Sequence, residues 1–77
     1  MRGDVYFHKG DYSKAVDDYT RGFAKKPNIE ALSRRAEAYE KLGEHEKALA
    51  DYKAVLKNAP RHKGAVQGSA RLNQQSN

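Results

Sequence analysis

The feature that most constrains this chain is an internal repeat with an offset of 33 residues. Among the 27 pairs from Met1/Arg34 to Pro27/Pro60, eight are identical, whereas about two identities are expected by chance at average residue frequencies. The identical pairs are Arg2/Arg35, Tyr6/Tyr39, Gly10/Gly43, Lys14/Lys47, Ala15/Ala48, Asp18/Asp51, Tyr19/Tyr52 and Pro27/Pro60. A repeat of this length is one supersecondary unit that buries its apolar face against its neighbours. The sequence therefore predicts two copies of one unit, stacked side by side.

Apolar residues within both units recur at spacings of three and four, which is the period of an α-helix. The three stripes are Tyr12, Ala15, Val16, Tyr19 and Phe23; Ile29, Leu32, Ala36, Tyr39 and Leu42; and Ala48, Leu49, Tyr52, Val55 and Leu56. No segment alternates with period two for long enough to form a strand. The sequence thus predicts an all-α chain with helices at about 2–9, 12–25, 29–42, 45–58 and 62–73, followed by a frayed polar tail at 74–77.

Glycine and proline mark the predicted helix ends. Gly10 and Gly43 stand where the first helix of each unit ends, and glycine tolerates the left-handed conformation of a C-cap. The acid after each glycine lies near the next helix N-terminus, where negative charge is favoured. Pro27 and Pro60 close the second helix of each unit, because proline cannot continue a hydrogen-bonded helix. Each unit is therefore predicted to be a helix-turn-helix.

This pattern of small, aromatic, glycine and proline positions resembles the tetratricopeptide repeat. The first unit matches it at Gly3, Tyr6, Gly10, Tyr12, Ala15, Tyr19 and Pro27; the second matches at Leu32, Ala36, Tyr39, Gly43, Ala48, Tyr52 and Pro60. His45 replaces an aromatic residue, and the spacing is one residue shorter than the family period of 34. The resemblance implies a right-handed α-solenoid with an incomplete first unit at 1–27, a second unit at 28–60 and a capping helix at 61–73. Small residues at Gly3/Ala15 and Ala36/Ala48 should lie where paired helices approach most closely.

The same resemblance implies a non-catalytic scaffold for protein–protein interaction, with a peptide or partner helix in the concave groove. The side chains expected to face the groove are Asp4, Phe7, His8, Glu30, Ser33, Arg34, Glu37, Lys41, Lys63, Gln67 and Arg71. Arg34, Lys63, Gln67 and Arg71 are the expected polar anchors, with Phe7, His8 and Glu37 as further peptide contacts.

Residues 33–36 resemble the last repeat of co-chaperones that clamp the C-terminal carboxylate of heat-shock chaperones. Arg34 matches the arginine of that clamp, and a guanidinium grips a carboxylate through two hydrogen bonds. Glu30 stands where the clamp has a lysine and Met1 where it has an asparagine. A chaperone C-terminus is therefore one candidate partner, with two clamp positions changed.

The net charge of +5 comes entirely from residues 52–77, because residues 1–51 carry ten basic and ten acidic side chains. This basic segment leaves open a second interpretation, the binding of an anionic ligand or nucleic acid, although no aromatic residue follows Tyr52 to stack bases. A third is an architectural segment of a longer repeat array. The incomplete first unit predicts self-association through the face of residues 1–23.

Enzyme and cofactor chemistry find no support in the sequence. There is no cysteine, no phosphate-binding glycine loop, and His8, His45 and His62 have no metal-ligand spacing. Apolar runs are too short to span a bilayer, and no basic-then-apolar leader opens the chain. We therefore expect no cofactor, no metal, no membrane partner and a cytoplasmic location, with a nuclear one left open.

Overall fold

The computed structural model describes residues 2–75, and this part of the chain forms five α-helices. Their bounds are α1 Arg2–Lys9, α2 Tyr12–Lys25, α3 Ile29–Leu42, α4 His45–Asn58 and α5 Lys63–Gln75. The predicted all-α class is confirmed. The expected start of α5 at residue 62 was early by one residue, and its expected end at Asn73 was wrong. Gln74 and Gln75 continue the helix because no glycine or proline stops it, while 76–77 lie outside the described residues.

Both short turns between paired helices use a left-handed glycine. Gly10 and Gly43 have φ angles of 85° and 80°. The amide of Gly43 donates to the Glu40 carbonyl at 3.0 Å and the next amide donates to the Tyr39 carbonyl at 2.9 Å, which satisfies the last carbonyls of α3. The acid after Gly10, Asp11, caps α2 by accepting from the Lys14 amide at 3.3 Å. These contacts place each pair of helices antiparallel.

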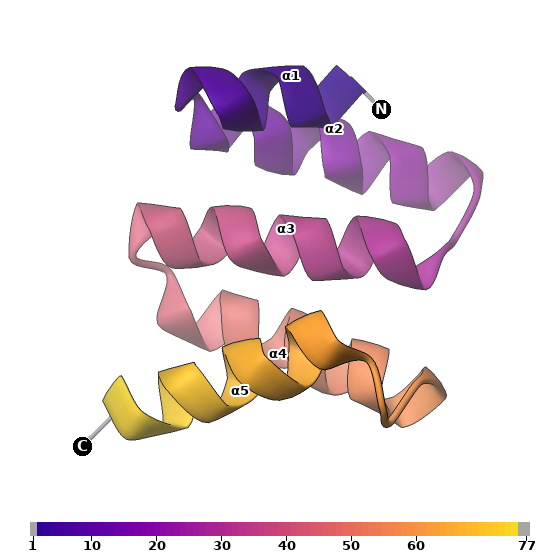
Figure 1. The fold of residues 1–77 in the computed structure, drawn as a ribbon. Helices are drawn as coiled ribbons and strands as arrows, with labels where there is room; N and C mark the ends of the chain where they lie inside the picture. The colour runs from indigo at the N-terminus through magenta and orange to yellow at the C-terminus, as the bar shows by residue number, and fades with distance from the viewer. Residues whose placement is uncertain (1, 76–77) are drawn as a thin grey trace.

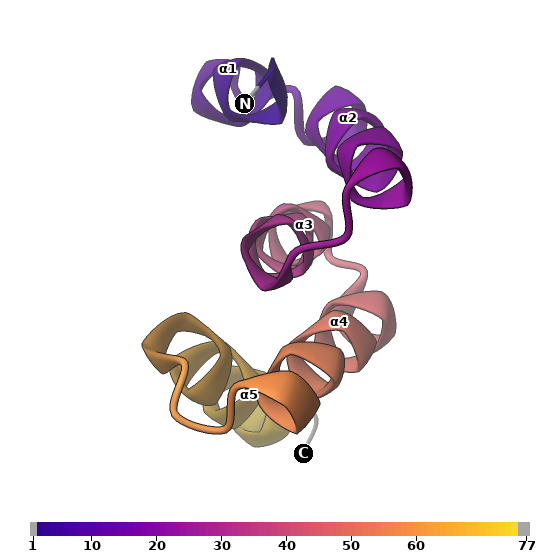
Figure 2. The same ribbon diagram turned by 90° about the vertical axis from the view of Figure 1, so that its right-hand side faces the viewer.

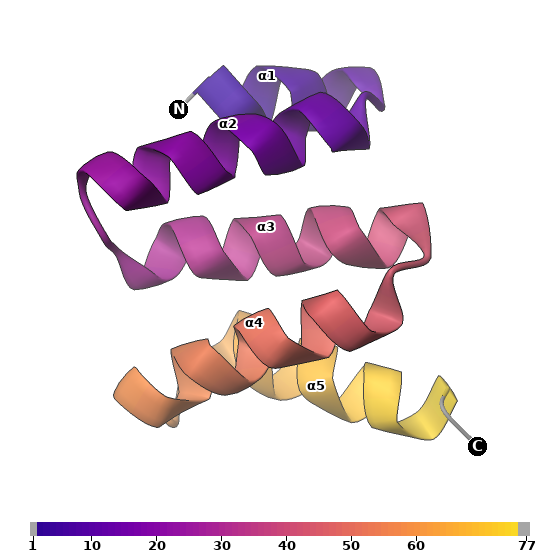
Figure 3. The ribbon, with the colours of Figure 1, turned by 180° about the vertical axis from the view of Figure 1, so that it is seen from behind.

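The helices form two sides of a stack. Figure 1 shows α1 in front of α2 at the top, α3 in the middle, and α5 in front of α4 at the bottom, and Figure 3 shows the same layers from behind. Figure 2, which looks along the helices, shows α1, α3 and α5 on one side and α2 and α4 on the other, with α3 set back between α1 and α5. We call the side formed by α1, α3 and α5 the inner side.

The core consists of two clusters that hold the repeat positions. Tyr19 and Tyr52 are the largest side chains that are fully buried. Tyr19 packs with Ala15 and Ala38 between the first three helices. Tyr52 belongs to the second cluster, together with Leu32, Ala36, Ala48, Val55, Ala65 and Leu72. The buried tyrosines and alanines of the repeat therefore lie where the helices pack together.

Two glycines allow these rings to approach a neighbouring helix. A Cβ atom on Gly3 in α1 would lie 2.7 Å from Tyr19 Cε1, and one on Gly68 in α5 would lie 2.3 Å from Tyr52 Cζ. Real Cβ atoms essentially never come this close to another heavy atom. Gly3 was predicted as a close-packing position, but Gly68 was not, because it lies outside the repeated pattern.

One ion pair ties the middle of the stack together. Arg35 in α3 donates from Nε and Nη2 to the two carboxylate oxygens of Asp51 in α4, at 2.7 and 2.8 Å. Its Nη1 also donates to the hydroxyl of Thr20 in α2 at 3.0 Å. Asp51 is buried, so its charge depends on this arginine. The pair fixes α2, α3 and α4 relative to one another.

The first helices of the two units, α1 and α3, differ in how well one repeat position is covered. Ala38 of α3 is fully buried against α2, whereas Val5, which occupies the same repeat position in α1, is 52% exposed. Self-association through residues 1–23 stays a prediction, and Val5 is an exposed apolar side chain within that segment.

Candidate functional site

The side chains predicted to face the groove all belong to α1, α3 or α5, the helices of the inner side; that they face one groove stays a prediction. His8, Arg34, Lys63, Gln67 and Arg71 are exposed, and Phe7 and Glu37 are half-buried. The expected exposure of Ser33 was wrong. Ser33 is only 3% exposed, because the first turn of α5 covers it at Gly64. Phe7 also packs edge-on against Tyr12 of α2, with ring centroids 5.2 Å apart, so only part of its ring is available to a ligand.

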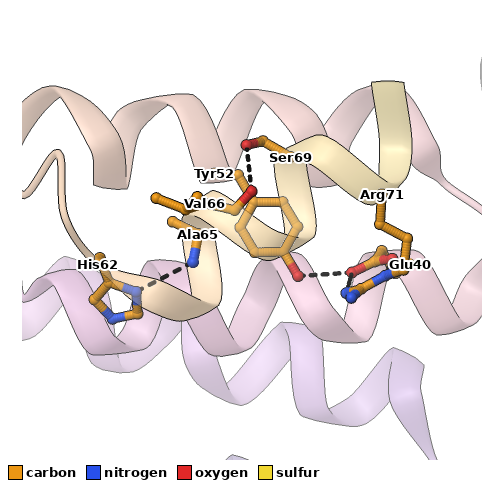
Figure 4. A network of polar contacts seen from close by, with 7 residues as sticks. All are labelled: Glu40, Tyr52, His62, Ala65, Val66, Ser69 and Arg71. Atoms are coloured by element: carbon orange, nitrogen blue, oxygen red, sulfur yellow. Dashed lines mark hydrogen bonds and ion pairs between the residues drawn. The ribbon is translucent and has the colours of Figure 1, made fainter. Parts of the chain in front are cut away.

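A polar network at the inner side joins α3, α4 and α5 (Figure 4). Arg71 donates from Nε and Nη2 to the two carboxylate oxygens of Glu40, at 2.9 and 2.7 Å. The buried Tyr52 donates its hydroxyl to Glu40 Oε1 at 2.7 Å. Glu40 thus bridges an arginine on the inner surface and a tyrosine in the core.

The three groups of this network shift each other's pKa. Burial by itself raises the pKa of Glu40, but hydrogen bonds from Arg71 and Tyr52 outweigh it, and the pKa is lowered overall. Burial and the hydrogen bond to Glu40 raise the pKa of Tyr52. The hydrogen bond to Glu40 also raises the pKa of Arg71. The network therefore consists of a carboxylate, a cation and a neutral phenol at physiological pH.

A similar chain of contacts occurs in the first unit. The hydroxyl of Tyr19 donates to the carboxylate of Asp4 in α1, and Arg34 Nη1 in α3 lies 3.5 Å from Asp4 Oδ1. Burial and this hydrogen bond raise the pKa of Tyr19. In both units a core tyrosine therefore supports an inner-side carboxylate, which in turn holds an arginine from the next helix of the inner side. We call these the tyrosine–carboxylate–arginine relays.

Sequence reasoning missed Glu40 as a member of the inner side. Its repeat counterpart is Phe7, so the repeat itself gives no carboxylate at this position. Helical spacing was the available signal, because Glu40 follows Glu37 by three residues and neighbours it on one helix face.

The other end of the inner side holds a smaller network. His62 Nδ1 accepts from the Ala65 amide at 3.2 Å and thereby caps α5. Because Nδ1 accepts, Nε2 carries the ring proton, and it lies 3.2 Å from Glu30 Oε1. Glu30, the position where the chaperone clamp has a lysine, is therefore engaged with α5.

A depression with a volume of about 730 Å³ lies beside the Glu40 relay. It is lined by Glu37, Glu40, Lys41, His45 and Arg71. Two carboxylates face two cations here, so the lining has no strong net charge. Lys63, Gln67, Phe7 and His8 do not line it.

Within residues 2–75, no three His, Asp or Glu side chains gather in an arrangement that would hold a metal ion. No helix in the same part of the chain combines the length and the apolar character that crossing a membrane requires.

Comparison with known proteins identifies the repeat. Two family models described as tetratricopeptide repeat match residues 1–27 and residues 29–62. The chain is 41% identical over 69 residues to human tetratricopeptide repeat protein 4, with 83% of this chain and 18% of that protein covered. It is 39% identical over 57 residues to mouse tetratricopeptide repeat protein 12, with 73% and 8% covered. With human sperm-associated antigen 1 it shares 37% identity over 59 residues, with 77% and 6% covered.

The chain thus spans less than a fifth of the length of these relatives. Repeats of this type generally mediate protein–protein interaction and are generally non-catalytic scaffolds. Two family matches, the 33-residue repeat and the stacked helix pairs agree with one another. The chain belongs to the tetratricopeptide repeat family.

Proposed function

We propose that the inner side binds an extended peptide or a partner helix in a groove between α1, α3 and α5, without catalysis. The observation that carries this proposal is the pair of tyrosine–carboxylate–arginine relays. They hold Arg34 and Arg71 at the inner surface, one in each interval between inner helices. Lys63 and Gln67 on α5, and Phe7 and His8 on α1, are the adjoining contacts of the proposed groove.

The relays support binding because they fix the arginines before a ligand arrives. The side chains of Arg34 and Arg71 remain 46% and 51% exposed although each already contacts a carboxylate. A guanidinium has five N–H donors, and Arg71 uses only Nε and Nη2 on Glu40. The remaining donors are available to backbone carbonyls or to a carboxylate of the ligand, and little side-chain entropy is lost on binding.

The charge of the inner side selects the kind of peptide. The groove positions predicted from the sequence, together with Glu40, comprise four acids and four cations: Asp4, Glu30, Glu37 and Glu40, and Arg34, Lys41, Lys63 and Arg71. A surface of balanced charge gives no long-range attraction to a polyanion. We therefore expect a ligand of mixed polarity that is recognised by several local hydrogen bonds.

The test begins with selection of displayed random peptides of about 12 residues against the folded chain. Amide chemical shifts of the isotope-labelled chain then locate the selected peptides. We expect shifts in α3 and α5, and a loss of about five- to tenfold in affinity for Arg34→Ala. Arg21→Ala is the matched control, because Arg21 is also an exposed arginine paired with one aspartate but lies on α2. Equal affinity of both variants, or shifts confined to α2 and α4, would refute the groove.

A chaperone C-terminus is the specific version of this proposal. The peptide ending in Glu-Glu-Val-Asp, compared with its C-terminal amide, isolates the contribution of the terminal carboxylate. Arg34 must leave or share Asp4 to grip that carboxylate, and Glu30 repels it. Equal binding of the acid and the amide would rule out a clamp and leave the groove proposal intact.

A further inference from the structure

We propose a second binding site at the end of the stack where α2 passes into α3 and α4 passes into α5, and that its ligand is an acidic peptide with one large apolar side chain. Figure 1 shows both of these connections at the same end of the molecule, opposite the two glycine turns. This site borders the proposed groove at Lys63, which begins α5 and is counted in both surfaces, but its binding does not depend on the proposed groove function. We call it the basic end.

The basic end is defined by an excess of unpaired cations. Residues 21–32 and 53–64 contain seven Lys or Arg and a single acid, Glu30. Glu30 is engaged by His62, and Arg21 is paired with Asp17 at 3.0 Å. The other six cations form no ion pair within residues 2–75; they are Lys25, Lys26, Lys53, Lys57, Arg61 and Lys63. The unpaired positive charge is thus concentrated here; without Lys63, which both surfaces share, the groove positions carry four acids and three cations.

An apolar pocket of about 270 Å³ opens at the basic end. Its lining comes from α2, the α2–α3 connection, the start of α3 and the last residue of α4, and consists of Phe23, Pro27, Asn28, Ile29, Leu32 and Asn58. Lys26 directly precedes Pro27, and Lys57 directly precedes Asn58. Pockets that enclose drug-sized ligands have volumes of about 300–1,000 Å³, so this smaller one suits a single leucine, isoleucine or phenylalanine side chain.

Helix dipoles explain part of the charge, because cations are favoured near helix C-termini. They account for Lys25 and Lys57 in the last turns of α2 and α4. They do not account for Lys63, which begins α5, where a positive charge is unfavourable. The binding of one negatively charged ligand accounts for all six cations at the basic end.

A peptide fits this surface better than a nucleic acid does. Single-stranded nucleic acids need exposed aromatic faces on which bases stack, and the one aromatic residue at the basic end, Phe23, is half-buried against the core. The pocket offers mainly apolar side chains instead of donors for base edges. An acidic peptide can use both features, with carboxylates on the lysines and its apolar side chain in the pocket.

Fluorescence anisotropy with labelled synthetic peptides tests this site. The probe is acetyl-Asp-Glu-Asp-Leu-Asp-Glu-amide, which has no terminal carboxylate to engage Arg34. Two further probes are the same peptide with serine in place of leucine and a thymidine oligonucleotide of similar charge. The site variant is Lys26→Glu/Lys57→Glu. The control Lys9→Glu/Lys47→Glu makes the same change in net charge at the opposite end of the stack.

We expect the leucine peptide to bind and the serine peptide to bind about tenfold more weakly. We expect the site variant to lose about tenfold or more in affinity for the leucine peptide, and the control variant to lose much less. No binding of the leucine peptide up to about 1 mM would overturn the proposal. So would equal losses in both double variants, equal binding of the leucine and serine peptides, or tighter binding of the oligonucleotide. Arg34→Ala leaves this binding unchanged if the site is separate, so a failure of the groove is distinguishable from a failure of the basic end.

Discussion

Replacing Gly68 by alanine places a methyl group inside the ring of Tyr52. The new Cβ atom would lie 2.3, 2.5 and 2.7 Å from three ring atoms, whereas carbon atoms pack at about 3.5–4.0 Å. Tyr52 cannot swing away, because its ring is fully buried and its hydroxyl is held by Glu40. We therefore expect α5 to move outward from α4, which also strains the contact between Arg71 and Glu40.

Two opposing effects set the change in the free energy of unfolding that Gly68→Ala causes. Overpacking a core costs about 1–3 kcal/mol, and a required shift of about 1 Å points to the upper part of that range. Alanine is favoured over glycine in a helix by about 1 kcal/mol. The net loss in the free energy of unfolding is about 1–2 kcal/mol. For a chain of 77 residues, each kcal/mol lowers Tm by about 4–8 °C, so we expect Tm to fall by about 5–15 °C.

Gly22→Ala is the matched control for this substitution. Gly22 also lies in a helix, but nothing stands within 4 Å of the Cβ atom that alanine would add. Only the higher helix propensity of alanine then acts, and we expect the free energy of unfolding to rise by about 0.5–1 kcal/mol. Thermal and urea unfolding followed by circular dichroism measure both variants. An increase in Tm for Gly68→Ala, or equal shifts for the two variants, would show that α5 does not pack on Tyr52 as described.

Three further predictions concern the core. Arg35→Ala should lower the free energy of unfolding by about 2–4 kcal/mol, because it leaves the buried Asp51 carboxylate without its partner. Urea unfolding measures this loss, and a loss below about 0.5 kcal/mol would contradict the role of the ion pair. The pKa values of Tyr19 and Tyr52 are raised above the ordinary value of 10.0, so the stability that depends on their neutral hydroxyls is complete below about pH 10 and is lost as the pH rises further. Urea unfolding at increasing pH, with tyrosinate absorbance recorded in parallel, tests this, and ionisation of both residues without loss of structure would disprove it. Ala48→Leu should cost about 1–3 kcal/mol, because Ala48 is fully buried where α3 and α4 meet; an unchanged Tm would mean that the helices are not closely apposed there.

The helices were predictable because their signals are local. Apolar spacing of three and four identifies each helix from its own residues, and Gly10, Gly43, Pro27 and Pro60 define the ends without reference to the rest of the chain. The end of α5 was misplaced for the same reason. Residues 73–75 contain neither a strong helix signal nor a stop signal, so local reasoning had nothing to decide between helix and tail.

The inner side was only partly predictable. Its exposed side chains follow from helix position, so Arg34, Lys63, Gln67 and Arg71 were assigned to a surface on which the structure leaves them exposed. The burial of Ser33 was missed, because it depends on where the first turn of α5 lies. The partners of the arginines were missed as well. Glu40 and Arg71 are 31 residues apart in the chain, and no local pattern links them.

The sequence by itself determined that the chain consists of two helical hairpins and a further helix, because the apolar periodicity, the turn residues and the 33-residue offset can all be read from the order of the residues alone. Only the tertiary structure decided which charges are engaged and which are free. Arg34 and Arg71 are held by carboxylates on neighbouring helices. Lys26 and Lys57, which adjoin residues of the apolar pocket, form no ion pair within residues 2–75. The physical reason is that ion pairs depend on distances of a few ångströms, and packing brings those distances about between residues that lie far apart in the chain.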